Sequence, residues 1–339
     1  MTATVLLTGA TGFVGTALVK RLCKRGAAVH ALVRERSDRG PLAEYPLTYH
    51  LGDLRDGESV EGFVEAGVAA GRAAPAGGPV HLIHSGALIS YRTRDRRRQE
   101  AINTAGTRAV LEAARRQGVD RLVHVSSIVG VAHSPGGELR DETATWNLGE
   151  LGNDYADTKH AAEELARAAA ADLDLVIVNP GAIFGPAPGR SNTVEFLRRV
   201  QANRLGPLAP PASLAVVGID DVADGILLAL DKGRRGRRYI LTESNPTHLE
   251  VFRCVAAALG ARSPRHSAPR WLWPLIVGGV ALIDRVRPAE LVTPQALRAL
   301  GTSFRFDNSR AREELGWRPR PFADVIEDAV RTLRARGDL

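Results

Sequence analysis

The sequence predicts an α/β fold in which a doubly wound parallel sheet is joined to a smaller, interleaved C-terminal lobe. Through the first half of the chain, short β-branched or apolar runs alternate with longer segments of helical periodicity, which is typical of parallel strands joined by crossover helices. A glycine-rich turn directly follows the first apolar run. After Gly181 the pattern changes to pieces punctuated by proline and glycine, and the length of 339 residues leaves room for a second lobe.

Six strands and three helices are predicted for the first half. The strands are expected at Thr4–Thr8, Ala28–Val33, Leu47–Leu51, His81–Ser85, Leu122–Ser126 and Leu175–Asn179. The helices are expected at Phe13–Arg25, Gln99–Gln117 and Tyr155–Ala171. The segment Ala69–Pro79 is rich in alanine, glycine and proline, and it is interpreted as a surface loop.

The second half of the chain is predicted to divide between the sheet domain and the smaller lobe. Helices are expected near Thr193–Ala202, Val222–Leu230, His248–Leu259 and Phe322–Arg336. We expect residues 1–180 to form the domain that holds the sheet, and residues 213–242 to return to it. Residues 181–212 and 243–339 are expected to form most of a substrate-binding lobe that closes over the carboxyl edge of the sheet.

The composition is that of a globular protein with an excess of arginine. The formal net charge is +7, and only four of the 45 basic residues are lysines. Apolar residues make up 44%, which excludes a disordered chain, and the 5% of aromatic residues argues against a stacking surface for single-stranded nucleic acid. The basic run Arg92–Arg98 is broken by Asp95 and is interpreted as a solvated helix start, so no nucleic-acid partner is expected.

Cysteine usage and the N-terminal sequence predict a cytoplasmic protein without a metal site. Cys23 and Cys254 lie far apart, and no histidine and cysteine cluster has the spacing of metal ligands, so two reduced thiols are expected. The first residues enter a strand pattern at once and lack the basic region of a signal peptide. No apolar run is long enough to predict a transmembrane segment.

The longest apolar run is Trp271–Ile283, which proline and glycine interrupt. It is interpreted first as a buried helix of the smaller lobe. Two alternatives stay open, namely the wall of a lipophilic pocket and a contact with a membrane surface.

The strongest local motif is the turn Thr8–Gly15, which reads TGATGFVG and opens a helix directly after the first strand. Glycines permit the tight turn and a close approach of the backbone to a pyrophosphate, while the helix N-terminus supplies N–H groups and a positive dipole. This placement predicts a dinucleotide-binding (Rossmann) domain. The residues expected to contact the dinucleotide here are Gly9, Thr11, Gly12, Phe13, Val14 and Gly15.

The end of the second strand favours NADP over NAD. The position where NAD-binding proteins hold the ribose with a carboxylate is occupied by Arg34, and Glu35 follows one residue too late. A guanidinium suits a 2′-phosphate by its charge and its bidentate geometry. Arg36 and Arg39 lie close enough in sequence to assist, and NAD stays open because Glu35 could turn inward.

Two further strand ends carry residues expected at the cofactor. Asp53, with Leu54 beside it, follows the third strand, where a short acid could accept a hydrogen bond from the adenine amino group. Ser85, Gly86 and Ala87 end the fourth strand, and their small size would let a cofactor cross the sheet edge.

The reaction chemistry is predicted at Ser127, Tyr155 and Lys159. Ser126 and Ser127 end the fifth strand, and Tyr155 and Lys159 lie four residues apart on one face of an alanine-rich helix. A free tyrosine has a pKa of about 10, and a neighbouring cation stabilises the phenolate and lowers that pKa. The spacing therefore predicts a tyrosine that acts as a general acid at neutral pH.

With these motifs in order, the chain resembles the extended short-chain dehydrogenase/reductase superfamily (the NAD-dependent epimerase/dehydratase family) over essentially its whole length. Within it, the chain looks most like the branch of dihydroflavonol reductases and 3β-hydroxysteroid dehydrogenases. The matching segments are Thr8–Gly15, Gly52–Leu54, Asn103–Thr107, Val125–Ser127, Tyr155–Lys159, Asn179–Pro186, Asp220–Gly225 and Phe306–Pro319.

The resemblance implies a role for each matching residue. Tyr155 would be the acid and base, Lys159 would lower its pKa and hold the nicotinamide ribose, and Ser127 would orient a substrate carbonyl. The segment Asn179, Pro180, Gly181 and Ile183 would contact the nicotinamide end, with Ser126 as a neighbour. The resemblance also implies a homodimer formed through a four-helix interface.

Three activities are weighed against these residues. Sugar-nucleotide dehydratases carry acids directly after the catalytic serine or threonine, whereas Ile128–Gly130 follow Ser127 here. The arginine that sugar-nucleotide epimerases place before their Asp-Asp pair is absent from Ser213–Asp221. The sequence therefore favours an NADPH-dependent reductase of a ketone or aldehyde on an apolar small molecule, or the reverse oxidation. The alternatives are a sugar or sugar-nucleotide epimerase and an NADP-binding regulator without turnover.

Overall fold

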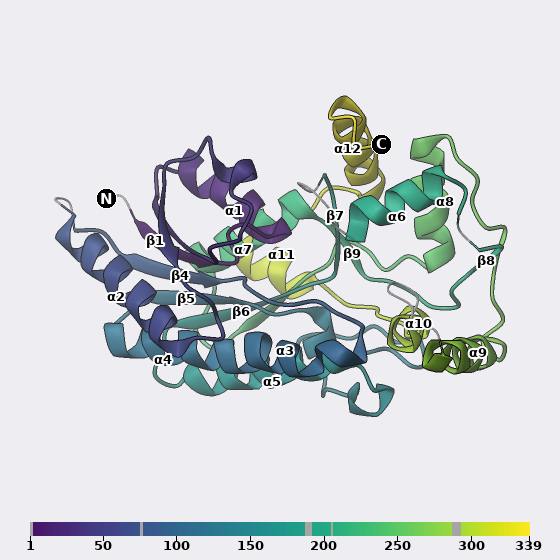
Figure 1. Cartoon of the computed structure of the whole chain (residues 1–339), viewed down its shortest axis with the longest axis horizontal. Helices are drawn as coiled ribbons and strands as arrows, with labels where there is room; N and C mark the ends of the chain where they lie inside the picture. Colours follow the sequence, from purple (N-terminus) through teal and green to yellow (C-terminus); the bar gives the residue numbers. More distant parts are fainter. Residues whose placement is uncertain (1–2, 75–76, 187–191, 205, 287–292) are drawn as a thin grey trace.

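The computed structural model describes residues 3–74, 77–186, 192–204, 206–286 and 293–339. A parallel sheet of seven strands forms the centre of the larger part (Figure 1), and its spatial order is β10-β6-β5-β4-β1-β2-β3. The order reverses between β1 and β4, and open α/β sheets bind ligands at the carboxyl ends of strands at such a point. The strands are β1 (Thr4–Thr8), β2 (Ala28–Val33), β3 (Leu47–Leu51), β4 (Val80–His84), β5 (Arg121–Val125), β6 (Leu175–Pro180) and β10 (Arg238–Leu241).

Helices cover both faces of this sheet, which confirms the predicted doubly wound α/β class. Figure 1 shows one layer of helices on each side. The first layer holds α2 (Gly57–Ala73), α3 (Arg96–Gln99), α4 (Gly106–Gln117) and α5 (Asp154–Ala169). The second layer holds α1 (Phe13–Lys24), α7 (Ile219–Lys232) and α11 (Ser309–Leu315). A π-helical segment, Glu100–Ala105, joins α3 to α4, so the single helix predicted at Gln99–Gln117 contains an irregular turn.

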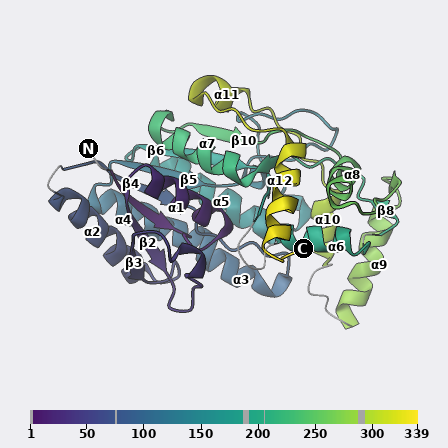
Figure 2. The same cartoon turned by 90° about the horizontal axis from the view of Figure 1, so that it is seen from above.

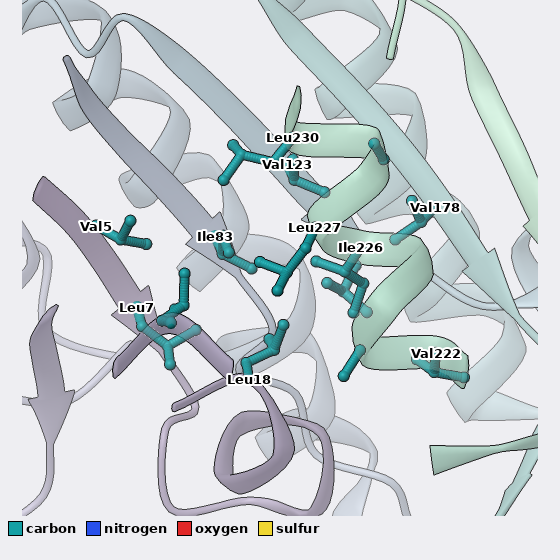
Figure 3. Close-up of a cluster of buried hydrophobic side chains, with 14 of the residues drawn as sticks. Val5, Leu7, Leu18, Ile83, Val123, Val178, Val222, Ile226, Leu227 and Leu230 are labelled. Atoms are coloured by element: carbon teal, nitrogen blue, oxygen red, sulfur yellow. The ribbon is translucent and has the colours of Figure 1, made fainter. Parts of the chain in front are cut away.

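The larger core lies between the sheet and the layer of α1 and α7. Figure 3 shows Leu7 and Ile83 on the strands facing Leu18 of α1 and Leu227 of α7. Residues one position along the strands point to the opposite face, where Leu6 belongs to a second core with α2 and α4. Because both faces of the central strands are buried, those strands are largely apolar, and this pattern is what made them predictable.

The surface loop predicted at Ala69–Pro79 is wrong for its first part, because α2 extends to Ala73. The glycines that hid this helix are required by its packing. A Cβ on Gly67 would collide with the side chain of Leu6, and one on Gly71 would lie 2.6 Å from Val80 Cγ2. Glycine lowers helix propensity by about 1 kcal/mol relative to alanine, so the close packing of this helix on the sheet removed its sequence signal.

The chain returns to the sheet twice after β6. Strand β10 pairs in parallel with β6, and α7 packs against the sheet beside it. Later in the chain, α11 and the buried ring of Trp317 also belong to the larger core. The sheet domain is therefore assembled from separate stretches of sequence.

The smaller lobe lies at one end of the sheet (Figure 1). A core of its own joins α6 (Asn192–Gln201), α8 (His248–Leu259) and α12 (Phe322–Ala335) to β7 (Ala182–Phe184) and β9 (Val216–Gly218). Its remaining elements are β8 (Leu208–Ala209), β11 (His266–Ser267), α9 (Trp273–Val286) and α10 (Pro294–Gly301).

Helix α9 contains most of the apolar run, and the interpretation of that run as a buried helix holds for one face alone. Val277 is buried, whereas Trp271, Leu275 and Leu282 are exposed. None of the described helices is both long and apolar enough to cross a membrane. Within the same residues, no cluster of histidine, cysteine and carboxylate side chains could hold a metal ion, and both cysteines are free thiols.

Candidate active site

The glycine turn after β1 is packed too tightly for side chains at two of its positions. Gly9 has a φ of +75°, and a Cβ there would lie 2.7 Å from the backbone nitrogen of Gly86. A Cβ on Gly15 would collide with the carbonyl oxygen of Gly9. The turn is closed by a hydrogen bond of 2.9 Å from Gly12 N to Gly9 O. These contacts fix the turn against the end of β4.

The N-terminus of α1 fits a bound phosphate. Its N-cap is Gly12, whose extended backbone offers no side-chain cap, and the first turn carries no acidic residue. The free N–H groups of this turn and the positive end of the helix dipole attract an anion. Thr11, Phe13 and Val14 flank these N–H groups in sequence. The residues present therefore suit the pyrophosphate of a dinucleotide.

Hydrogen bonds hold the end of β4 beside this turn. The Ser85 hydroxyl donates to the Thr8 carbonyl at 2.7 Å, and the Gly86 N–H donates to the Thr8 hydroxyl at 3.2 Å. A Cβ on Gly86 would lie 2.7 Å from Leu54 Cδ1, so Leu54 packs directly over this glycine. Ala87 follows and is exposed. The predicted residues of β1, β3 and β4 are thus brought to one edge.

The end of β2 presents Arg34, Glu35 and Arg36 as exposed side chains.

Asp53, which follows β3, does not present a free carboxylate, because Arg55 binds both of its oxygens, at 3.0 and 2.8 Å. This pairing holds the pKa of Asp53 below its ordinary value. A contact between Asp53 and an adenine amino group would therefore share an oxygen with Arg55.

Ser127, Tyr155 and Lys159 lie together where β5 ends and α5 begins. The Ser127 hydroxyl lies close enough to the Tyr155 hydroxyl to act on its pKa. Tyr155 is buried, and Lys159, one turn further along α5, is 3% exposed. The Lys159 ammonium donates to the carbonyl oxygen of Val125 at 2.9 Å, which anchors it under the end of β5. The side chain of Asn153 caps α5 by accepting from the Ala156 N–H, so the helix starts at a fixed point before Tyr155.

Burial dominates the charge states of this group. It raises the pKa of Tyr155 above its ordinary value, and the neighbouring Ser127 hydroxyl partly opposes that rise. The predicted lowering by Lys159 is not found. Burial also lowers the pKa of Lys159 to about 8, with Glu163 acting in the opposite direction. Buried His84, whose pKa is lowered to about 3, is neutral beside this ammonium.

His84 connects three elements below the site. Its Nδ1 lies 2.7 Å from the Thr8 hydroxyl, and its Nε2 lies 3.0 Å from the Thr107 hydroxyl of α4. Because a neutral imidazole supplies one donor and one acceptor, the two threonines satisfy both ring nitrogens. The ring thereby fixes the end of β4 relative to β1 and α4.

A buried ion pair under the site was not found from the sequence. Arg238 of β10 donates to Glu163 Oε1 at 3.0 Å, and both side chains are buried. Glu163 Oε2 accepts from the Ser126 hydroxyl and from Asn179 Nδ2, each at 2.6 Å. Asn179 Nδ2 also donates to the Ser127 carbonyl at 3.0 Å. This network fixes the backbone from which the Ser127 side chain projects.

The remaining predicted residues lie at the end of β6 and just after it. Pro180 is the last residue of that strand, and Gly181 is enclosed by protein, since a Cβ on it would lie 2.5 Å from the Ala215 carbonyl oxygen. Ile183 packs against the larger core. Asn179 Oδ1 is buried without a hydrogen-bond partner in the structure, which leaves one polar atom of this segment available to a ligand.

A second tyrosine contacts the site and was also missed. The rings of Tyr91 and Tyr155 meet edge to face with centroids 6.3 Å apart. The Thr293 hydroxyl donates to the Tyr91 carbonyl at 2.7 Å, and Gln295 Nε2 donates to Asp154 Oδ2 at 2.8 Å. The start of α10 is thus attached to the residues around Tyr155. No local signal in the sequence indicates these two links, which span 202 and 141 positions.

Comparison with known proteins gives the family. The model of the NAD-dependent epimerase/dehydratase family matches residues 5–241, which include the glycine turn, Ser127, Tyr155 and Lys159. The chain belongs to the NAD-dependent epimerase/dehydratase family. The predicted membership is thereby confirmed.

Three proteins illustrate what the chain is similar to. Sterol demethylase protein B of Methylococcus capsulatus is 34% identical over 98% of this chain and 99% of that protein. A putative dihydroflavonol 4-reductase of Synechocystis is 30% identical over 98% of this chain and 94% of that protein. The crystal structure of gox2253 has a TM-score of 0.83 at 29% identity and covers 99% of both chains.

Proposed function

We propose that the protein is an NADPH-dependent oxidoreductase that reduces a ketone or aldehyde on an apolar small molecule, or oxidises the corresponding alcohol. The observation that carries this proposal is the grouping of the Ser127 and Tyr155 hydroxyls at the carboxyl edge of the sheet, with the Lys159 ammonium held one helical turn further along α5. This edge is also where the glycine turn offers its N–H groups to a dinucleotide.

The two hydroxyls would act on one oxygen atom. A carbonyl oxygen placed between them would accept a hydrogen bond from Ser127 and then a proton from Tyr155 as negative charge develops on it. The phenol of Tyr155 is protonated at neutral pH and therefore has a proton to donate. NADPH, when bound, supplies the hydride that reaches the carbonyl carbon.

The cofactor contacts proposed from the sequence divide among three strand ends. Gly9, Thr11, Gly12, Phe13, Val14 and Gly15 would hold the pyrophosphate, with Ser85, Gly86 and Ala87 beside it. Arg34 would bind the 2′-phosphate, and Asp53 and Leu54 would lie near the adenine. Ser126, Lys159, Asn179, Pro180, Gly181 and Ile183 would surround the nicotinamide end.

Replacing Arg34 by alanine should weaken NADPH binding about 10- to 100-fold and leave NADH binding nearly unchanged. A charge-assisted hydrogen bond to the 2′-phosphate is worth about 1.5–3 kcal/mol, and NADH has no such group. Fluorescence titration with both nucleotides measures the two dissociation constants. Arg25→Ala is the matched control, since this exposed arginine pairs with Asp231 at the other end of α1. Equal losses for NADPH and NADH would contradict the NADP assignment.

An apolar substrate is favoured by the relatives and by the residues around Ser127. Two relatives are named for sterols and dihydroflavonols. Ile128 and Val129 follow Ser127 where a dehydratase would need acids, and Trp146 donates to the Val129 carbonyl nearby.

We also propose a cytoplasmic homodimer formed through the outer faces of α4 and α5.

The proposed activity is tested by NADPH oxidation against a panel of steroid ketones, flavanonols and aromatic aldehydes, with UDP-glucose as the comparison. Loss of NADPH absorbance together with formation of the alcohol is the expected result. Interconversion of UDP-glucose and UDP-galactose without net consumption of cofactor would instead establish an epimerase. Tight NADPH binding with neither reaction would favour a regulator.

Turnover should fall as the pH rises through about 8. Lys159 loses its proton there, because burial lowers its pKa to about 8 from the ordinary 10.5.

The free energy of unfolding should rise over pH 8 to 10.5, since in that range the unfolded chain binds a proton that the folded chain does not. Rate profiles and urea denaturation across this range measure both effects. Lys159→Met should remove the rise in stability, and an unchanged rise would refute its assignment to this residue.

A further inference from the structure

The outer face of α9 carries a row of apolar side chains that the protein leaves exposed. Trp271, just before the helix, is 72% exposed, Leu275 and Leu282 are each 65% exposed, and Ile283 is 64% exposed. Positions 271, 275 and 282 recur at the spacing of one helical face. Gly278 lies between them, and a Cβ added to it would meet nothing within 4 Å. The face is therefore continuous and open.

The opposite face attaches α9 to the body of the lobe. Trp273 Nε1 donates to the Leu297 carbonyl of α10 at 3.0 Å, and its ring lies against Gly301. Val277, one turn further, is buried. The inner face thus fixes the orientation of the helix, so the exposed row is a fixed surface and not a frayed end. Figure 2 shows α9 at the end of the molecule opposite β3.

The sequence that leads into this face is strictly basic. Residues 251–283 contain four arginines and no aspartate or glutamate. Arg253, Arg262, Arg265 and Arg270 are exposed. Arg253 donates to the Arg265 carbonyl at 3.0 Å, which places two of these arginines together, and Arg270 directly precedes Trp271. Exposed apolar and cationic groups are therefore combined on one segment.

We propose that the outer face of α9 docks on the surface of a lipid bilayer that contains anionic phospholipid. The helix has 14 residues, so it is about 21 Å long and too short to span a hydrocarbon core of about 30 Å. It would lie in the plane of the interface, with Leu275 and Leu282 among the acyl chains and Trp271 at the headgroup level. The arginines would pair with the lipid phosphates.

Charge argues against a second copy of the chain as the occupant of this face. A two-fold interface sets the same patch against itself, so the Arg270 side chains of both copies would be brought into one interface, and residues 251–283 hold no carboxylate to pair with them. An anionic bilayer neutralises these charges at the same time as it buries the apolar row. The bilayer is therefore the partner whose chemistry complements the whole surface.

Docking would also bring the membrane close to the candidate active site. Helix α9 is attached to α10, and α10 starts at residues that contact Tyr91 and Asp154. An apolar substrate dissolved in the bilayer could then enter beside α10. This consequence rests on the proposed function, whereas the docking itself does not.

The test is flotation of the full chain with two kinds of vesicle, one of phosphatidylcholine alone and one of equal parts phosphatidylcholine and phosphatidylglycerol. The mixed vesicles should carry the protein upward, and the neutral ones should carry much less. The double substitution Leu275→Gln and Leu282→Gln should reduce the bound fraction about tenfold. Leu51→Gln is the matched control, because Leu51 is 63% exposed at the end of β3. It should bind as the unaltered protein does.

A second pair of substitutions tests the charge. Arg265→Gln with Arg270→Gln should remove the preference for the anionic vesicles, as should high salt. Since all four substituted side chains are exposed, thermal unfolding should be unchanged and serves as the folding control. No flotation with mixed vesicles, or undiminished flotation of the leucine variant, would overturn the proposal. So would a dimer in sedimentation equilibrium that the leucine variant abolishes, because the face would then be a contact between copies.

Discussion

Tyr155→Phe is expected to lower kcat for carbonyl reduction about 1,000-fold while the affinity for NADPH stays within about twofold of the original. General acid catalysis by a positioned side chain contributes about 10²- to 10⁴-fold, and the substitution removes the proton that the carbonyl oxygen would receive. The ring itself is retained, so its edge-to-face contact with Tyr91 and the packing around it are preserved. Single-turnover measurements with saturating NADPH separate the chemical step from binding.

Tyr45→Phe is the matched control for this substitution. Tyr45 packs against the larger core near β3, away from Ser127, and losing its hydroxyl should leave kcat unaltered. If the Tyr155→Phe variant kept the original turnover on an identified substrate, Tyr155 would not be the acid. If both variants lost NADPH binding, the loss would reflect folding and not chemistry.

Glu163→Ala is expected to lower the free energy of unfolding by about 3–5 kcal/mol. This is the largest loss of stability that we predict for a substitution among the described residues. The substitution leaves the Arg238 guanidinium buried without its carboxylate, and breaking a buried pair from one side costs about that much. It also removes the acceptor shared by Ser126 and Asn179. Urea denaturation measures the loss.

Glu164→Ala, one position along α5, is the control for the loss of a carboxylate. Its pairing with Arg167 is exposed on both sides, and such pairs contribute about 0–1 kcal/mol. Equal losses for the two alanine variants would refute the role of the buried network. The milder Glu163→Gln should move the fall in turnover to lower pH, because the carboxylate raises the pKa of Lys159 and the amide does not. A purely structural contact would leave that pH profile in place.

Local patterns predicted much of this molecule, and contacts between distant segments account for what was missed. Tyr155 and Lys159 lie four residues apart, so helical geometry alone places them together. Glu163 extends the same face by another turn, yet its role depends on Arg238, which comes from the added strand β10, 75 positions later. Tyr91 likewise meets Tyr155 through a loop whose course no periodicity encodes.

Two expectations failed for physical reasons that a sequence does not show. Helix α2 was missed because Gly67 and Gly71, which weaken a helix in isolation, are needed where it packs on Leu6 and Val80. A lowered pKa of Tyr155 was expected from its spacing to Lys159, but burial raises that pKa and the ammonium donates instead to the Val125 carbonyl. Burial is a property of the assembled fold, so neither outcome could be derived from local spacing.

The way β10 is added to the sheet restricts how the smaller lobe can be exchanged during evolution. Strand β10 covers β6, and α7 and α11 return to the same domain from different points of the lobe. A fragment that ended at Pro180 would expose β6 as an open edge with apolar side chains on both faces, which invites aggregation. The lobe therefore cannot be transferred between relatives as one contiguous cassette. New specificities have to arise by changes within its separate segments, while the returning strand and helices stay in place.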